Sequence, residues 1–368
     1  MWSAYLFQVT TGTIGPRLNY EELSWSCELN GTETISVSLR KSDLPTVDLN
    51  YWLAAWWAGV VIFWNDVPVV AGPILTRPHE SISKITVNCG GIRSVLAARL
   101  VVQEYNDWWY LSQEKLTYKN LSLGTIAKRV VQRAQMKPAG ALPISYPIAD
   151  QAGNHERNYN GFDLQNLTCD DVLTKLSNVI NGPDIMFRPR MVNDRQLTFD
   201  MWYGTDKEPR IAQKVTKIWD TRVAQGTVSD MSLIYTGSYQ SNRVYSLGAG
   251  QDKGLLIKVS HNDGPLQKQF PLLERVINIG NSENPSVVQG YGDASIKTNE
   301  DALLEVQMTV RGDGDNGFGK FWPGDMAQVY VKGWLSLPDG MTEMRILSLT
   351  GNSSNNVRIS LQREDKFD

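Results

Sequence analysis

The sequence has few of the side chains that most often carry catalysis or bind metals. Among its 368 residues there are 3 cysteines and 3 histidines. The cysteines are far apart and odd in number, which indicates neither a disulfide framework nor a clustered metal site. No two histidines have the spacing of a metal-binding pair. We interpret the cysteines as buried thiols in a reducing compartment and predict no metal and no cofactor. These residues are Cys27, Cys89, Cys169, His79, His155 and His261.

An excess of one charge and a membrane-spanning apolar run are also missing. The chain has 36 Lys and Arg against 39 Asp and Glu, a net charge of −3, so nothing suggests a protein that wraps nucleic acid. The apolar stretch 51–64 falls short of the about 20 residues that a spanning helix needs. Residues 1–17 have no early positive charge and no long apolar run, which argues against a secretory signal. We predict cytoplasmic assembly and no stable membrane insertion.

Motifs that resemble ligand loops or catalytic sites fail at required positions. Asp313 and Asp315 have the spacing of a calcium loop, but Gly324 stands where the last carboxylate is needed. A Gly-x-Ser-x-Gly nucleophile elbow is absent from the sequence. We interpret Glu21-Glu22 as a solvated turn and Asp170-Asp171 as a helix start that stabilises the helix dipole. We predict that the protein is not an enzyme.

Residues 1–112 have the alternation of an antiparallel β domain. Apolar residues recur at every second position in residues 35–39 and 85–87. Turn signals follow at Asn30-Gly31, Asn65-Asp66 and Arg77-Pro78, a spacing that favours a barrel or sandwich. A short helix over about residues 94–100 closes this part.

The aromatic stretch 52–74 combines two expected features. Val60 to Trp64, the Asn65-Asp66 turn and the valines after it predict a hairpin that is buried on at least one face. Before it, the spacing of Trp52, Trp56 and Trp57 suits a short helical turn over the open end of a sheet. Such rings serve either as core or as a partner interface, and the sequence leaves both roles open.

Residues 113–212 have the pattern of a small α+β unit. Residues 121–136 place apolar side chains on one face of an amphipathic helix. A second helix starts near residue 169, with Thr168 or Asp170 as its cap, and stops at Gly182-Pro183. A hairpin around Asn193-Asp194 follows.

Residues 213–368 return to β patterns, first around residues 234–247. An irregular and partly helical insertion is expected at about residues 250–305. Pro323-Gly324-Asp325 predicts a type II turn before a strand, and residues 344–363 predict a hairpin. The two ends of the chain resemble each other in this order, which suggests a duplicated β barrel.

The order of these segments resembles the tail-hub, or baseplate-hub, minor tail proteins of long-tailed phages that infect actinobacteria. The resemblance covers most of the chain and is carried by structural rather than catalytic motifs. The motifs are "GVVIFWNDVPVVAGPI", "LGTIAKRVV", "TCDDVLTKL" and "PGDMAQVYV…MRILSLTGNSSNNVRISL".

The resemblance implies two tube-like antiparallel β barrels, residues 1–112 and 213–368, flanking the α+β middle part. It implies a homotrimer at the distal end of the tail tube that adapts the sixfold tube to threefold tip or fibre proteins. The implied partners are a distal tail protein ring, the tape measure protein and downstream tail-tip or fibre proteins. DNA would pass through the ring without specific binding, and the protein would reside in the virion.

A receptor-binding or carbohydrate-binding tail-tip protein is the alternative. In that case exposed Trp108 and Trp109 of the segment "NDWWYL" would stack on sugars, whereas a hub would bury them on trimer formation. Trp52, Trp56, Trp57, Trp108 and Trp109 are therefore our candidate interface aromatics. A hydrolase of cell wall or peptide is a third and weaker alternative, for which the sequence nominates no residues.

Overall fold

The structure is a computed structural model that describes residues 1–44, 47–103, 108–179, 181–211, 217–222, 227–280, 282–312 and 317–363. Most of its elements are strands. The elements of the N-terminal part are β1 (Trp2–Gln8), β2 (Ile14–Leu18), β3 (Tyr20–Glu28), β4 (Thr34–Arg40), α1 (Leu49–Trp52), β5 (Ala58–Trp64), β6 (Val67–Glu80), β7 (Lys84–Gly90) and α2 (Arg93–Ala97).

The middle and C-terminal parts follow in the same way. The middle part contains α3 (Trp108–Gln113), β8 (Lys115–Leu121), α4 (Leu123–Gln135), β9 (Ile144–Ser145), β10 (Ala152–Asn160), α5 (Cys169–Ser177), β11 (Ile185–Asn193) and β12 (Gln196–Tyr203). The C-terminal part contains β13 (Lys217–Asp220), β14 (Val228–Thr236), β15 (Arg243–Leu247), β16 (Ile257–His261), α6 (Gly264–Gln267), β17 (Glu274–Asn278), α7 (Pro285–Asn299), β18 (Leu303–Arg311), β19 (Met326–Val331), β20 (Gly340–Asn352) and β21 (Asn356–Arg363).

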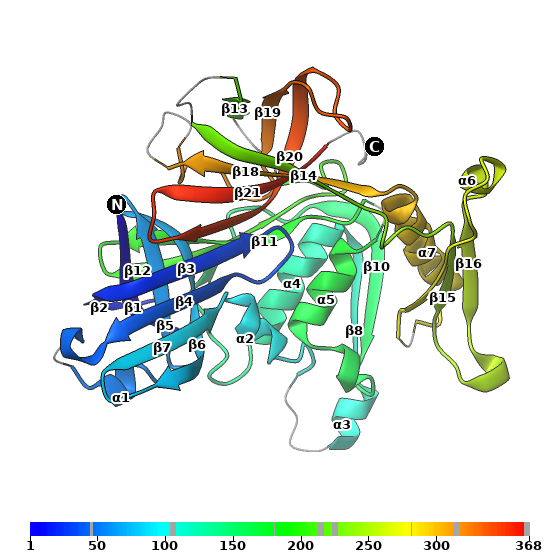
Figure 1. Ribbon diagram of the computed structural model, residues 1–368. Coiled ribbons are helices and arrows are strands. Elements are labelled where there is room, and N and C mark those ends of the chain that lie inside the picture. The colour runs from blue at the N-terminus through cyan, green and yellow to red at the C-terminus, as the bar shows by residue number, and fades with distance from the viewer. Residues whose placement is uncertain are drawn as a thin grey trace.

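Strands from both ends of the chain form one large sheet. Within the described residues it has 13 strands, in the order β14-β18-β21-β20-β3-β4-β7-β6-β5-β1-β2, with β19 on β20 and β13 on β19. The blue and the red strands of Figure 1 therefore belong to the same sheet, although the α+β part separates them in sequence. The mainly β prediction is confirmed.

The sheet is built from two units with the same strand order. The first unit has the order β3-β4-β7-β6-β5, and the second has the order β14-β18-β21-β20-β19. All neighbours within each unit are antiparallel. Strand pairing among the described residues closes neither unit into a barrel, because β2, β13 and β14 each pair on one side alone. The structure thus contains a duplicated antiparallel unit.

The two units meet at one strand pair, which we call the seam. In the seam, residues 24–28 of β3 run antiparallel to residues 348–352 of β20. Trp25 is buried and lies over Gly351, where an added Cβ would come within 2.4 Å of the indole ring. Glycine at position 351 therefore lets a large ring cover the junction between the units.

The apolar run of β5 is explained by burial on both faces. Val60, Ile62 and Trp64 belong to the core that the two units share. Val61 and Phe63 point the other way, into a second core under α2, α4 and α5. A strand covered on both sides carries apolar residues at successive positions, so this segment is the buried hairpin that the sequence predicts.

The two amphipathic helices form the layer beneath this hairpin. Helix α4 begins after Ser122, whose hydroxyl accepts a hydrogen bond from Thr125 N, and α5 begins after Thr168, whose hydroxyl accepts from Asp171 N. Such caps satisfy backbone donors that the first turn leaves unpaired. In Figure 1 the helices lie side by side between the large sheet and the β8–β10 ribbon. Both predicted helices are confirmed, although α5 ends at Ser177 and not at Gly182-Pro183.

The insertion between β14 and β18 folds on its own small sheet. Its strand order is β16-β15-β17, and α7 packs against β15 and β16. Figure 1 shows this part beside the main body. The helical part of the predicted insertion is α7. The β pattern expected over residues 234–247 is instead two strands of different sheets, because residues 237–242 interrupt it.

Two turn predictions are wrong. Arg77-Pro78 lies inside β6, where the register to β7 shifts at a bulge, and the turn comes after Glu80. Glu21-Glu22 lies in β3 rather than in a turn. Turn-forming residues also occur at bulges and sheet edges, which is where the structure places them. No helix of the described part is long and apolar enough to cross a membrane.

The packing of the seam predicts the effect of one added methyl group. We expect Gly351→Ala to lower the free energy of unfolding by about 1–3 kcal/mol, because the buried Trp25 ring has no room to move away. Gly290→Ala is the matched control, since a Cβ there meets no atom within 4 Å. Urea denaturation measures both, and equal midpoints for the two variants would contradict close packing at the seam.

Candidate functional site

A polar surface covers the outer side of the sheet across both units. We define the polar face as the outward residues of β14, β18, β21, β20, β3, β4 and β7, whose alternate residues point into the shared core. Its hydroxyl and amide residues are Ser24, Ser26, Thr34, Ser36, Ser38, Thr86, Asn88, Ser229, Ser232, Gln307, Thr309, Ser348, Thr350, Asn352, Asn356, Ser360 and Gln362. It contrasts with the apolar underside.

Hydrogen bonds link these short side chains across neighbouring strands. Ser38 lies 3.0 Å from Thr86, oxygen to oxygen. Ser26 lies 2.7 Å from Thr34 in the same way. In the second unit, the Ser360 hydroxyl donates to Glu305 Oε1 at 2.6 Å. The polar face is therefore a surface of short, mutually bonded groups.

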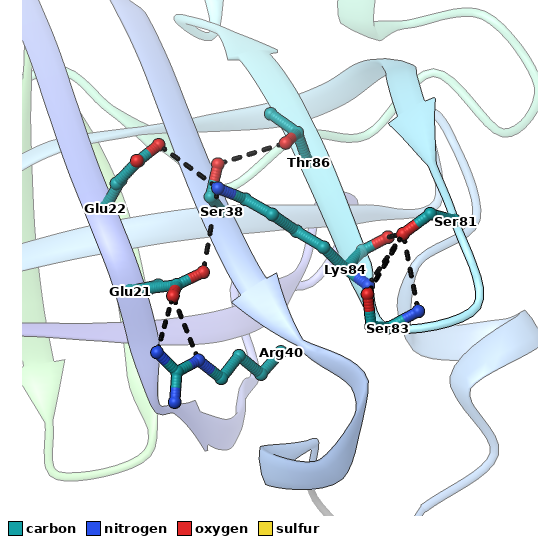
Figure 2. Close-up of polar contacts among 8 residues, drawn as sticks. All are labelled: Glu21, Glu22, Ser38, Arg40, Ser81, Ser83, Lys84 and Thr86. Carbon is teal, nitrogen blue, oxygen red and sulfur yellow. Dashed lines mark hydrogen bonds and ion pairs between the residues drawn. The ribbon is translucent and has the colours of Figure 1, made fainter.

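A cluster of charged side chains lies at the β3–β4–β7 end of the polar face. Arg40 donates two hydrogen bonds to Glu21 Oε1, at 2.9 and 2.7 Å. Lys84 Nζ lies 3.6 Å from Glu21 Oε2 and 3.5 Å from Glu22 Oε2. Figure 2 shows the Lys84 side chain extending across the strands toward both carboxylates. Each cation at this end thus has an acidic partner.

A bulge in β3 makes this arrangement possible. The register between β3 and β4 shifts between Tyr20 and Glu22, so successive residues no longer alternate strictly between the two faces. Glu21 and Glu22 therefore both reach Lys84. Both residues are predicted from the sequence to lie in a turn, whereas the bulged strand β3 holds them beside Lys84.

The pairing keeps both partners charged at neutral pH. Hydrogen bonds from Arg40 lower the pKa of the Glu21 carboxyl, and the same bonds raise the pKa of Arg40. The described strands of the polar face carry acidic side chains, among them Glu21, Glu22, Glu28, Glu305 and Glu343, beside the basic Arg40, Lys84, Arg311 and Arg358. The face is polar but has no net positive charge.

The candidate aromatics of residues 51–57 form one cluster beside β2. Tyr51 and Trp57 have ring centroids 3.5 Å apart, and Trp52 and Trp57 have centroids 5.3 Å apart with a T-shaped geometry. Trp52 and Trp57 are half-buried against the shared core. Trp52 lies against Gly15, where an added Cβ would be 2.3 Å from the ring.

Trp56 differs from its neighbours in the cluster. It is 48% exposed and has a left-handed backbone with φ of 67°, which is strained for a bulky residue. Its amide N donates to Ile74 O at 2.9 Å, which holds the backbone in place. The structure therefore fixes this indole at the surface.

The remaining candidates from the sequence are two tryptophans, a calcium-like loop and the cysteines. The side chains of Trp108 and Trp109 lie outside the described residues, as do Asp313 and Asp315 of the calcium-like loop. Among the described residues, no three His, Cys, Asp or Glu side chains gather as a metal site would require. Cys27, Cys89 and Cys169 are buried free thiols, and burial raises the pKa of each.

A buried arginine joins the first unit to the helical layer. Arg93 is 3% exposed and its Nε donates to Asp170 Oδ1. Its other nitrogens donate to Asn30 O in the β3–β4 turn and to Thr174 Oγ1 in α5. Asp170 therefore neutralises a buried cation as well as standing at a helix start. A second buried pair, Asp184 with Arg345, ties the middle part to β20.

Glu33 carries a buried carboxyl group in the turn between β3 and β4. It is 4% exposed, and its Oε2 has no hydrogen-bond partner. Gly91 allows this close approach, since a Cβ there would lie 1.7 Å from that oxygen. Burial raises the pKa of Glu33 to about 7, an effect that its own backbone N–H and Arg93 reduce.

The whole fold is similar to that of solved tail proteins. The chain is similar to the 43 kDa tail protein of prophage MuSo2 from Shewanella oneidensis, with a TM-score of 0.59, 12% identity and coverage of 100% of both chains. It is similar to a tail protein from Neisseria meningitidis MC58, with a TM-score of 0.58, 11% identity and coverage of 99% of this chain and 96% of the other.

A third structure has a similar fold within a longer chain. The chain is similar to part of the Francisella PdpA–VgrG complex, with a TM-score of 0.50, 7% identity and coverage of 99% of this chain and 58% of the other. No protein-family model and no curated protein sequence matches the chain. At these identities the common property is the fold.

Glu33 makes stability depend on pH. Its pKa of about 7 exceeds its ordinary value of 4.5, so the folded protein binds more protons than the unfolded chain between these values. The contribution of Glu33 to the free energy of unfolding is therefore fully present below about pH 4.5. It is lost as the pH rises toward 7. The free energy of unfolding of the wild type should therefore fall by about 3 kcal/mol as the pH rises through this range. In Glu33→Gln we expect this fall to be absent.

Urea denaturation at several pH values between 5 and 8 measures this effect. Glu28→Gln, an exposed carboxylate in the preceding strand, is the control and should keep the wild-type slope. A wild-type slope in Glu33→Gln would show that Glu33 titrates normally in the folded protein.

Proposed function

We propose that the chain is a structural subunit of a phage tail hub, a homotrimer at the distal end of the tail tube. The observation that carries this proposal is the duplicated unit within one continuous sheet. A chain that presents two similar units allows three copies to offer six similar positions around an axis. Such a ring matches a sixfold tube on one side and threefold tip or fibre proteins on the other.

In this proposal each unit acts as a tube-like β domain, the first within residues 1–112 and the second within residues 213–368. The α+β part, residues 113–212, would lie on the side of the ring that faces away from the channel. The two-layer packing of β5 between separate cores supports a tube wall with a helical exterior. The neighbours of the ring would be a distal tail protein ring, the tape measure protein and tip or fibre proteins.

The polar face suits the inner side of such a ring. DNA phosphates bind strongly to unpaired cations, so a channel for DNA has to avoid them while remaining wettable. Hydroxyl groups supply the wettable surface, and Glu21 and Glu22 neutralise Arg40 and Lys84. DNA would therefore pass this surface without being held.

The aromatic cluster suits a contact between neighbouring subunits. Trp56 is fixed at the surface, and an exposed indole is a residue that interfaces favour. We include Trp52, Trp57, Trp108 and Trp109 in this contact proposal.

The proposed role of the protein is structural rather than enzymatic, since Asp170 and Glu21 have structural partners. The protein would belong to the virion of a long-tailed phage of actinobacteria, after assembly in the host cytoplasm.

The trimer is the first property to measure. Light scattering at several concentrations, with and without the neighbouring tail proteins, should give three times the chain mass of 41.3 kDa. Trp56→Ser should weaken this association while leaving thermal unfolding nearly unchanged, because the indole is half-exposed. A strictly monomeric protein that binds glycans would instead support the receptor-binding alternative.

The charge pairing predicts a gain of DNA binding. Glu21→Gln/Glu22→Gln releases Arg40 and Lys84, so we expect weak binding of double-stranded DNA that the wild type lacks. With two freed cations, the logarithm of affinity should fall with the logarithm of salt with a slope of about −2. Fluorescence anisotropy of a labelled duplex measures this in the purified full chain.

Glu156→Gln/Asp220→Asn is the matched control, because it changes the net charge equally. Glu156 pairs with Lys119 and Asp220 pairs with Arg222, away from the polar face. Equal binding by both double variants would contradict a special role of the polar face. That outcome would leave the trimer itself in place.

A further inference from the structure

The strand pairing of the seam within one chain indicates how two copies of the chain can pair with each other. In the seam, β3 of the first unit pairs with the end of β20 of the second unit. By strand order, β14 is the counterpart of β3, and β6 is the counterpart of β20. The counterpart of the seam is thus a pairing of β14 with the end of β6, and the chain does not make it with itself.

Both strands that this pairing requires have an open side. Among the described residues, β14 pairs with β18 alone, so its other side is free. The end of β6, residues 76–80, pairs only with β7 in the part of the chain that the structure describes, because β5 pairs with the first half of β6. Exposed strand edges are ready sites for pairing with another chain. Within one copy, the open edges of β14 and of residues 76–80 lie at the ends of the polar face.

We propose that β14 of one copy pairs antiparallel with residues 76–80 of β6 in the next copy, repeating the seam. This inference rests on the proposed ring. Beyond the ring itself, the inference specifies which strands pair at the junction between subunits and in which register they pair. The contact is head-to-tail, so each copy uses both edges and copies can close into a ring.

The register follows from equivalent ladder positions. Ile234 pairs with Glu305 in β18 as Ser26 pairs with Thr34 in β4. His79 pairs with Thr86 in β7 as Thr350 pairs with Arg358 in β21. Because Ser26 lies opposite Thr350 in the seam, Ile234 should lie opposite His79 of the next copy.

The surface chemistry of β14 fits a covered strand. Ile234 is 40% exposed and Tyr235 is 70% exposed, although their counterparts in the seam, Ser26 and Cys27, are half-buried and buried. Leu233 packs against the shared core. A neighbouring strand would cover the exposed apolar side chains and pair the free backbone groups.

The edge of β6 fits an edge strand that accepts a partner. Arg77, Pro78, His79 and Glu80 are exposed. Pro78 has no backbone N–H, and proline in sheets is confined to edges and bulges. The proposed junction would therefore have one donor fewer than a regular ladder, which makes it weaker than the seam within the chain. Reversible association of three copies is consistent with such a junction.

Cysteine pairs test the register directly. Directly opposite residues of antiparallel strands have their Cβ atoms about 4.5–5.5 Å apart, within reach of a short bis-maleimide. The native cysteines are buried with raised pKa values, so introduced thiols are the reactive ones. Ile234→Cys/His79→Cys should give linked dimers and closed trimers on denaturing gels, at a concentration where light scattering gives trimers or in assembled tails.

Ser26→Cys/Thr350→Cys is the matched internal control and should link within one chain, at the position of the seam. The single variants Ile234→Cys and His79→Cys should give no closed trimer. Trimers in solution without linkage of the Ile234→Cys/His79→Cys pair, when the internal control links, would overturn the junction and leave the hub proposal standing. A chain that stays monomeric alone and with its neighbours would overturn both.

Discussion

The pairing of β3 with β20 is the constraint on which the rest of the structure depends. It joins strands from opposite ends of the chain, so the first and the second unit become one sheet with one shared core. The α+β part has to lie to one side of this sheet, because the chain leaves the first unit and returns to complete the second. Buried ion pairs of Arg93 and Arg345 then fix that part against both units.

A continuous sheet also gives a continuous outer surface. The strands that place apolar residues in the core place mainly hydroxyl, amide and charged side chains on the polar face. The bulge in β3 brings Glu21 and Glu22 together there, where both lie close to Lys84. The same strand pairing that stabilises the fold thus also creates the polar face.

The fold elements that the sequence predicts are those with a strong local cause. The β5–β6 hairpin follows from β-branched residues and the Asn65-Asp66 turn, and α4 and α5 follow from their caps and apolar stripes. Serines and threonines of the polar face alternate with the apolar residues from which the strands are predicted, but this local pattern does not reveal which strands lie side by side. Arg77-Pro78 was misassigned as a turn because a bulge at a sheet edge uses the same residues.

The sequence by itself determined the mainly β class, the helical layer between two β parts and the similarity of the two ends. Each of these depends on side chains that are near one another along the chain. Tertiary structure decided that the two ends share one sheet, that Glu21 and Glu22 meet Lys84, and which strand edges stay open. Those features depend on pairs such as Trp25 with Gly351, which are distant in sequence and whose register no local period reveals.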